Sequence, residues 1–226
     1  MKELQVSRRR VLIAAGAVGV LGALGGPGTV SAEDDEGDER EQHERNGTRV
    51  RWDIIHVLPV PPGAGSVLSA GGEAFAFAYH TPTNPSSAQI RLTGSGTFVA
   101  PAGGGPSGSA KGGGTWQTSG AGLPTGSGTY RVTRLVSWAF ANFQFGDPGF
   151  VDHIGEKNET ANGSAVLLIK YDDGSDGILG IGCHGPGAPN GIVEGVIASK
   201  GYVTYWNAEL PTANVDKNRT LFHVRR

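Results

Sequence analysis

The chain consists of short alternating segments separated by glycine-rich turns, and this pattern limits its fold more than any other feature. Of its 226 residues, 38 are glycine and 13 are proline, without a collagen-like period. Between the turns, side chains alternate with period two, as in strands buried on one face. No segment carries a capped helical apolar stripe. The sequence therefore predicts an all-β protein, a single antiparallel β-barrel or β-sandwich of about 8–10 strands with Gly-rich loops.

Eight segments carry the strand pattern. They are 49–57, 73–80, 88–100, 129–143, 164–171, 177–184, 191–206 and 219–224. The turn Asp-Asp-Gly-Ser-Asp-Gly joins 164–171 to 177–184, which predicts a hairpin. Alternation blurs near 134–136, which predicts a β-bulge or a strong bend there.

Three glycine steps recur in the middle of the chain: GSGTF at 94–98, GGGTW at 112–116 and GSGTY at 126–130. Glycines within strands allow a sharp bend or the close approach of a second layer. The threonine then restores strand preference, and the ring fills the core. We therefore expect Phe98, Trp116 and Tyr130 to point into one interior from adjacent strands.

The first 32 residues have the layout of an export signal. A basic head precedes the apolar run 11–24, and Val-Ser-Ala at 30–32 supplies small residues for cleavage. Ser-Arg-Arg-Arg-Val-Leu at 7–12 resembles the twin-arginine (Tat) export signal, although Val11 stands where that family usually has phenylalanine. The resemblance implies an exported protein, periplasmic, cell-surface or extracellular after cleavage. The apolar run is shorter than the roughly twenty residues of a membrane span, so no stable membrane anchor is expected.

Charge divides the rest of the chain into two parts. Residues 33–48 begin with a dense acidic block without apolar side chains, which predicts a disordered linker. Residues 49–226 are nearly neutral and long enough for a single β domain with its own core. Because no basic stripe interleaved with aromatic residues is present, no nucleic-acid partner is expected.

Several catalytic motifs are absent from the sequence. The glycines of 102–114 lack the strand, helix and Lys-Ser/Thr pair of a phosphate loop. No serine elbow between a strand and a helix, and no His-Glu-x-x-His pair, is present. Cys183 is the one cysteine, in phase with Leu179 and Ile181, and we expect it to be a core thiol.

Glu194 and His184 are the candidate catalytic residues. Glu194 lies in phase with Ile192, Val196 and Ala198, so one interpretation turns its carboxylate inward, with a raised pKa. The alternative is an edge strand with Glu194 outward. A hairpin pairing 184 with 191 would place Glu194 roughly 10 Å from His184, too far for a direct bond but within reach of one shared ligand.

Three histidines, His56, His80 and His184, each lie near the end of an expected strand. If they met at one rim, the three imidazoles would suit copper or zinc. Scattered strand histidines are otherwise typical surface or rim residues. Beyond this candidate metal site, the cofactor is unknown from the sequence.

Five aromatic residues are candidates for a ligand pocket: Trp116, Trp138, Tyr202, Tyr205 and Trp206. Core packing is the alternative role for these rings. Three functions follow from these observations. The first is an exported β-barrel or sandwich that binds a small, partly apolar molecule in an aromatic-lined cavity. The second is an enzyme with an acid–base or mononuclear metal site around His184 and Glu194. The third is a structural or adhesive surface domain.

Overall fold

The computed structural model of the protein describes residues 47–59, 65–78, 88–100, 109–120, 123–144 and 149–225. These residues belong to one compact unit that spans 42–226. The expected export signal (1–32), nearly all of the expected linker (33–48) and His80 lie outside the described residues. Within the described ranges, no helix has the length and apolar character to cross a membrane.

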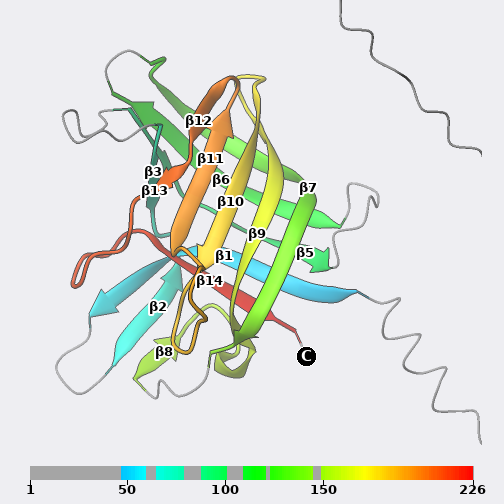
Figure 1. The fold of residues 1–226 in the computed structure, drawn as a ribbon, viewed down its shortest axis with the longest axis vertical. Coiled ribbons are helices and arrows are strands. Elements are labelled where there is room, and N and C mark those ends of the chain that lie inside the picture. The colour runs from blue at the N-terminus through cyan, green and yellow to red at the C-terminus, as the bar shows by residue number, and fades with distance from the viewer. Residues whose placement is uncertain are drawn as a thin grey trace, which may run out of the picture. The chain divides into compact units, whose positions relative to one another are not determined.

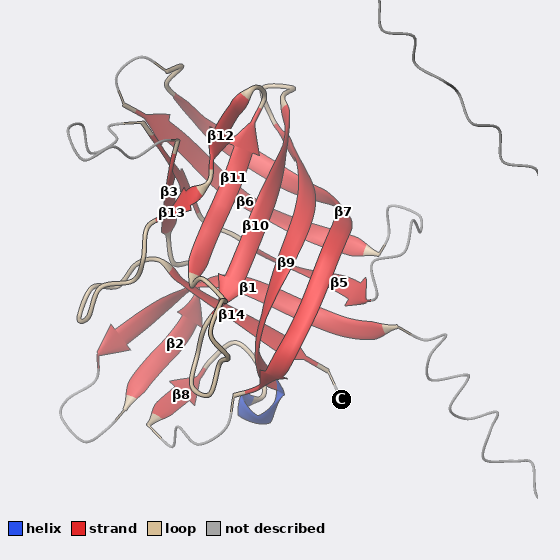
Figure 2. Cartoon of the chain, viewed as in Figure 1, coloured by secondary structure: helices blue, strands red, loops and turns tan. Residues whose placement is uncertain are grey.

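The described residues form fourteen strands and one short 3-10 helix. They are β1 (Thr48–Pro59), β2 (Ser66–Ala70), β3 (Ala74–Phe77), β4 (Gln89–Leu92), β5 (Ser95–Ala100), β6 (Ala110–Ser119), β7 (Gly126–Phe143), β8 (Phe150–Asp152), η1 (Lys157–Glu159), β9 (Thr160–Tyr171), β10 (Asp176–Cys183), β11 (Gly195–Lys200), β12 (Val203–Tyr205), β13 (Asn207–Ala208) and β14 (Arg219–Val224). The protein is therefore all-β, as the sequence predicts (Figure 2).

Six of the strands close into an antiparallel barrel. Around the ring the order is β9, β14, β1, β5, β6 and β7, and β7 pairs with β9 to close it. Three groups of strands extend outside this ring (Figure 1). Strands β10, β11 and β12 continue from β9, strands β4, β3 and β13 continue from β6, and β2 with β8 continues from β1. The pairing of β2 with β8 is parallel.

Local features of the sequence explain where the strands begin and end. The expected hairpin is confirmed, because β9 and β10 pair from Lys170–Asp176 to Gly163–Cys183. The irregularity expected near 134–136 is confirmed. The pairing of β7 with β9 shifts register between Val132 and Arg134 and again between Leu135 and Ser137. The expected strand 88–100 is interrupted at Thr93–Gly94, where Gly94 has a φ of 156°. This interruption divides one expected strand into β4 and β5. Strands β2, β6, β8 and β13 lie outside the eight expected segments, so the strand number exceeds the expected eight to ten.

Side chains fill the interior of the barrel, and Trp52 is the largest of those that are fully buried. Trp52 is fully buried and is the register partner of Phe222 on β14 and of Gly96 on β5. Gly96 in turn faces Gly112 on β6. A Cβ at position 96 would lie 2.1 Å from the Lys111 carbonyl oxygen and 2.8 Å from the indole Nε1 of Trp52. Glycine at position 96, in the first glycine step, therefore leaves room for the indole of Trp52.

The three rings that follow the glycine steps are all buried. Phe98, Trp116 and Tyr130 have exposed fractions of 1%, 6% and 4% and come from the adjacent strands β5, β6 and β7. All three belong to the same hydrophobic core cluster. The expectation that they point into one interior is confirmed.

We predict that Gly96→Ala lowers the free energy of unfolding by about 2–3 kcal/mol, because the new methyl group overlaps the backbone of β6 and the indole of Trp52. The matched control is Gly174→Ala, at a turn position with a φ of 89° and open space around it. That control is expected to cost only about 1 kcal/mol of backbone strain. Urea unfolding of both variants measures the difference, and equal losses would contradict the close packing at Gly96.

Candidate functional site

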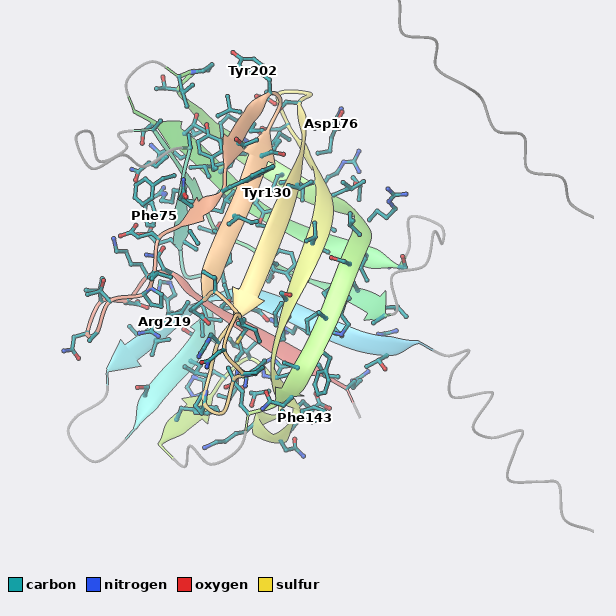
Figure 3. The ribbon with its side chains drawn as sticks, in the orientation of Figure 1. Phe75, Tyr130, Phe143, Asp176, Tyr202 and Arg219 are labelled. Carbon is teal, nitrogen blue, oxygen red and sulfur yellow. The ribbon has the colours of Figure 1, made fainter. Side chains whose placement is uncertain are left out.

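The structure distributes the five candidate rings over different parts of the molecule. Trp138 lines a recess beside the second half of β7, whereas Trp116, Tyr202 and Tyr205 line another recess at the β11–β12 turn. Trp206 lines neither recess, and its side chain is 62% exposed. Figure 3 shows Tyr202 and Phe143 near opposite ends of the molecule. The rings therefore do not form one pocket.

The ring recess lies between the second half of β7 and the ends of three other strands. It is lined by Thr48, Ala100, Trp138, Phe140, Phe143 and Val224 and has a volume of about 420 Å³. Trp138 packs edge-on against two core rings, with ring centroids 5.4 Å from Phe98 and 4.7 Å from Phe222. Phe140 and Phe143 pack against each other at 5.0 Å. The recess is thus an apolar surface continuous with the barrel core.

Bulges in β7 bring the three rings of this recess onto one face. The register partners of Trp138, Phe140 and Phe143 on β9 are Ala165, Gly163 and Ala161. The register shift between Phe140 and Asn142 compensates for the odd spacing of 140 and 143. A Cβ at Gly163 would lie only 3.0 Å from the indole of Trp138. The small side chains of β9 therefore make room for the large rings of β7.

Phe140 and Phe143 were not among the candidate residues from the sequence. Strict period-two alternation places Phe140 and Phe143 on opposite faces of a strand, and only the extra residue at a bulge places them together. The signal available in the sequence was the density of rings in WAFANF, residues 138–143.

The lysine recess, at the other end of the molecule, is centred on Lys200. It has a volume of about 200 Å³ and is lined by residues that include Trp116, Thr118, Asp173, Ser175, Lys200, Tyr202 and Tyr205. The Lys200 ammonium lies 4.1 Å from the ring centroid of Trp116 and 5.0 Å from that of Tyr171. It also donates hydrogen bonds to the Asp173 carboxylate and to Ser175 Oγ.

Hydrogen bonds of Asp172 beside this recess explain the third glycine step. The indole Nε1 of Trp116 donates to Asp172 Oδ1 at 2.9 Å, and the Thr129 amide donates to Asp172 Oδ2 at 2.8 Å. A Cβ at Gly128 would lie 2.3 Å from the Asp172 carboxylate oxygens. Glycine at 128 therefore admits the carboxylate that fixes the orientation of Trp116. Sequence reasoning identified Trp116 but missed Lys200, whose partners lie on β6, on β9 and in the turn between β9 and β10.

Glu194 faces inward, which confirms one of the two interpretations of its phase. Its side chain is nearly buried, and burial raises the pKa of its carboxyl group. The carboxylate accepts hydrogen bonds from the backbone amide of His184, from the Thr220 amide at 2.7 Å and from Thr220 Oγ1 at 3.3 Å. It thus joins the end of β10 to the start of β14.

The expected separation of His184 and Glu194 was wrong. The hairpin of β10 and β11 pairs Gly182 with Gly195, not 184 with 191, so the intervening loop folds back. The backbone of His184 consequently bonds directly to Glu194, whereas its ring Nδ1 lies 2.8 Å from the carbonyl oxygen of Ile192. Cys183 is buried, as expected, and its thiol contacts the Thr220 carbonyl oxygen at 3.3 Å.

The candidate metal ligands have separate partners where they are described. His56 Nδ1 lies 2.7 Å from Asp216 Oδ2, and the other oxygen of Asp216 accepts the Val57 amide at 2.7 Å. His184 bonds to Ile192, and His80 lies outside the described residues. Across the described ranges, no group of three or more His, Cys, Asp or Glu side chains is placed to hold a metal ion.

Comparison with known proteins supplies no assignment. The chain matches no protein family model, no curated protein and no solved structure.

We predict that Lys200→Met raises the pKa of Asp173, because the Lys200 ammonium is the largest cause that lowers this pKa to about 2. Ser175 also lowers it, so Ser175→Ala is expected to give a smaller rise. The pKa is measured by NMR from the side-chain carboxyl shift of Asp173. An unchanged pKa in Lys200→Met would show that the ammonium does not lie at this carboxylate in solution.

We also predict a pH-dependent effect of Glu194→Gln. Because burial raises the pKa of Glu194 in the folded state, the folded protein binds this proton more tightly than the unfolded chain does. The stability contributed by the protonated group is present at low pH and is lost as the pH rises from 4.5, the ordinary pKa, through the raised value. The neutral glutamine has no such dependence.

The unfolding free energy of the wild type minus that of Glu194→Gln should therefore fall with increasing pH. Urea unfolding of both proteins at closely spaced pH values measures this difference. A difference that increases with pH would mean that the hydrogen bonds to Glu194 outweigh its burial.

Proposed function

We propose that the protein is an exported β-barrel that binds a small, partly apolar molecule in the ring recess. The observation that carries the proposal is the placement of Trp138, Phe140 and Phe143 on one face of β7, around a recess of about 420 Å³. This volume lies within the range of about 300–1,000 Å³ that is typical of small-molecule sites. Export is supported by the twin-arginine-like head of the sequence.

The energetics of the recess support an apolar contact. Phe140 is 45% exposed although it belongs to a ring cluster that continues into the core. Covering apolar surface contributes about 25 cal/mol per Å², so a ligand ring placed against Phe140 would be stabilised. Thr48 has the one side-chain hydroxyl among the six lining residues, which favours a ligand that is mostly apolar where it enters.

The packed interior supports a site at the end of the barrel. Trp52, Phe98 and Phe222 are almost completely buried within the ring of six strands. Even barrels of about eight strands have an interior that side chains can fill, and six strands enclose less. The pairing of β7 with β6 ends at Arg131, and β7 continues beyond it. A ligand would therefore bind at this end of the barrel, where the other strands end.

The contacts of Glu194 favour binding over acid–base catalysis. Its carboxylate oxygens accept hydrogen bonds from two backbone amides and one hydroxyl, which is the arrangement of a residue that joins two strands. The ring of His184 points its Nδ1 at a backbone carbonyl rather than at this carboxylate.

We predict that Phe140→Ala weakens binding in the ring recess about tenfold, equivalent to about 1.4 kcal/mol. The probe is 8-anilinonaphthalene-1-sulfonate, a partly apolar molecule with two aromatic ring systems, titrated by fluorescence. The melting temperature should change little because Phe140 is half exposed. Val136→Ala is the matched control, since Val136 is 44% exposed on the same strand but does not line the recess.

Native mass spectrometry of the gently purified protein tests for a ligand from the host. A bound small molecule that is retained by Val136→Ala and lost from Phe140→Ala supports the proposal. Equal probe affinity in both variants and the wild type would contradict it.

A further inference from the structure

A second pocket, charged where the ring recess is apolar, lies on the outer face of the barrel. The charged pocket is lined by Arg49, Arg51, Thr97, His223 and Arg225 on one side and by Ile154, Gly155, Glu156 and Glu159 on the other. Its volume is about 360 Å³. The first group comes from the sheet strands β1, β5 and β14, with Arg225 directly after β14, and the second from the segment between β8 and β9.

Strand register builds a basic wall on the sheet side. Arg51 is the register partner of Thr97 on β5 and of His223 on β14, so the three side chains form a row across one face. Arg49 follows two residues away on the same face, and the Arg225 amide donates to the Arg49 carbonyl oxygen at 3.0 Å. The sheet thus presents three guanidinium groups to one pocket.

Two of these guanidinium groups have no acidic partner among the residues that the structure describes. Arg51 is neutralised by a bidentate contact with Asp53, at 2.7 and 2.9 Å. For Arg49 and Arg225, no carboxylate of the described residues lies within ion-pair distance. These two groups are therefore available to an anionic ligand, with the fork geometry that suits a carboxylate.

The 3-10 turn provides the opposite, acidic wall. Glu156 is the extended N-cap residue of η1 and Glu159 is its last residue, and both line the pocket. Lys157 does not neutralise them, because its ammonium bonds to the Phe150 carbonyl oxygen and lies 4.2 Å from the centroid of the Phe150 ring. No ion pair joins either glutamate to a cationic side chain of the described residues.

A buried histidine–aspartate pair fixes the acidic wall against the sheet. His223 Nε2 lies 2.7 Å from Asp152 Oδ2, and the two side chains are only 3% and 2% exposed. Asp152 Oδ1 accepts the amides of Ile154 at 2.8 Å and Gly155 at 3.2 Å. These bonds hold the segment that precedes Glu156 against the sheet.

We propose that the charged pocket binds a small zwitterionic molecule of the free amino acid type. Its carboxylate would contact Arg49 and Arg225, and its ammonium group would contact Glu156 and Glu159. A simple anion would satisfy the arginines but would be repelled by the glutamates, whereas a molecule with both charges complements both walls. This site is independent of the ring recess.

The test uses the purified protein at low ionic strength, where charge contacts are least screened. Each of the twenty standard L-amino acids is screened singly by thermal shift, and any that raises the melting temperature is measured by calorimetry. That amino acid is then compared with its two analogues that lack the amino group or the carboxylate. We expect at least one amino acid to bind, and each analogue to bind at least tenfold more weakly.

Variants locate the site. Arg49→Ala, Arg225→Ala and Glu159→Gln should each weaken binding at least tenfold. The matched control is the exposed ion pair of Arg91 with Glu73, 3.1 Å apart and outside the pocket, for which Arg91→Ala and Glu73→Gln should leave the affinity unchanged. Circular dichroism verifies that each variant is folded. The proposal is overturned if no amino acid binds, if the analogue without the amino group binds as tightly, or if the wall variants retain full affinity.

Discussion

The packing of Trp52 against Gly96 is the constraint on which the rest of the structure depends. A ring of six strands encloses a narrow interior, and the indole of Trp52 is the largest side chain that is fully buried there. It fits because its register partner on β5 is Gly96, where a Cβ would lie 2.8 Å from the indole Nε1. Close packing of this kind tolerates little added volume. The ring closes through two register pairs of β9 with β14 and the long pairing of β9 with β7.

A filled interior leaves the end and the outer face of the barrel for the two proposed sites. The ring recess extends the core beyond the pairing of β6 with β7, where bulges hold three rings on one face. The charged pocket uses the outer face, where register aligns Arg51 with Thr97 and His223. Both sites depend on strands whose inner faces pack the same core. The chemistry of the two sites differs because inward positions are apolar and outward positions are charged, as expected for period-two strands.

Local patterns of the sequence predicted the fold class, the β9–β10 hairpin, the irregularity of β7 and the burial of Phe98, Trp116 and Tyr130. Each of these depends on alternation or turn chemistry within one or two strands. The inward phase of Glu194 and the buried thiol of Cys183 followed from the same alternation. The contact between the His184 backbone and Glu194 did not, because a register shift of two residues in the β10–β11 hairpin is not encoded in local composition.

The candidate sites were less predictable from the sequence because they too depend on strand register and strand order. The sequence gives Trp138 and Trp116 the same candidate role. The two rings lie in different recesses because the order of the strands in the sheet determines their neighbours. Phe140 and Phe143 share a face only through a bulge. The charged pocket requires register across three strands and the position of a 3-10 turn, none of which alternation reveals.

The most direct test of the closed, filled barrel is the environment of the Trp52 indole in solution. NMR of protein labelled at glycine and tryptophan measures its nuclear Overhauser contacts and the exchange of its Nε1 proton. The structure predicts contacts from the indole to the α-protons of Gly96, together with slow exchange of a fully buried group. Rapid exchange with solvent and no contact to Gly96 would contradict the account.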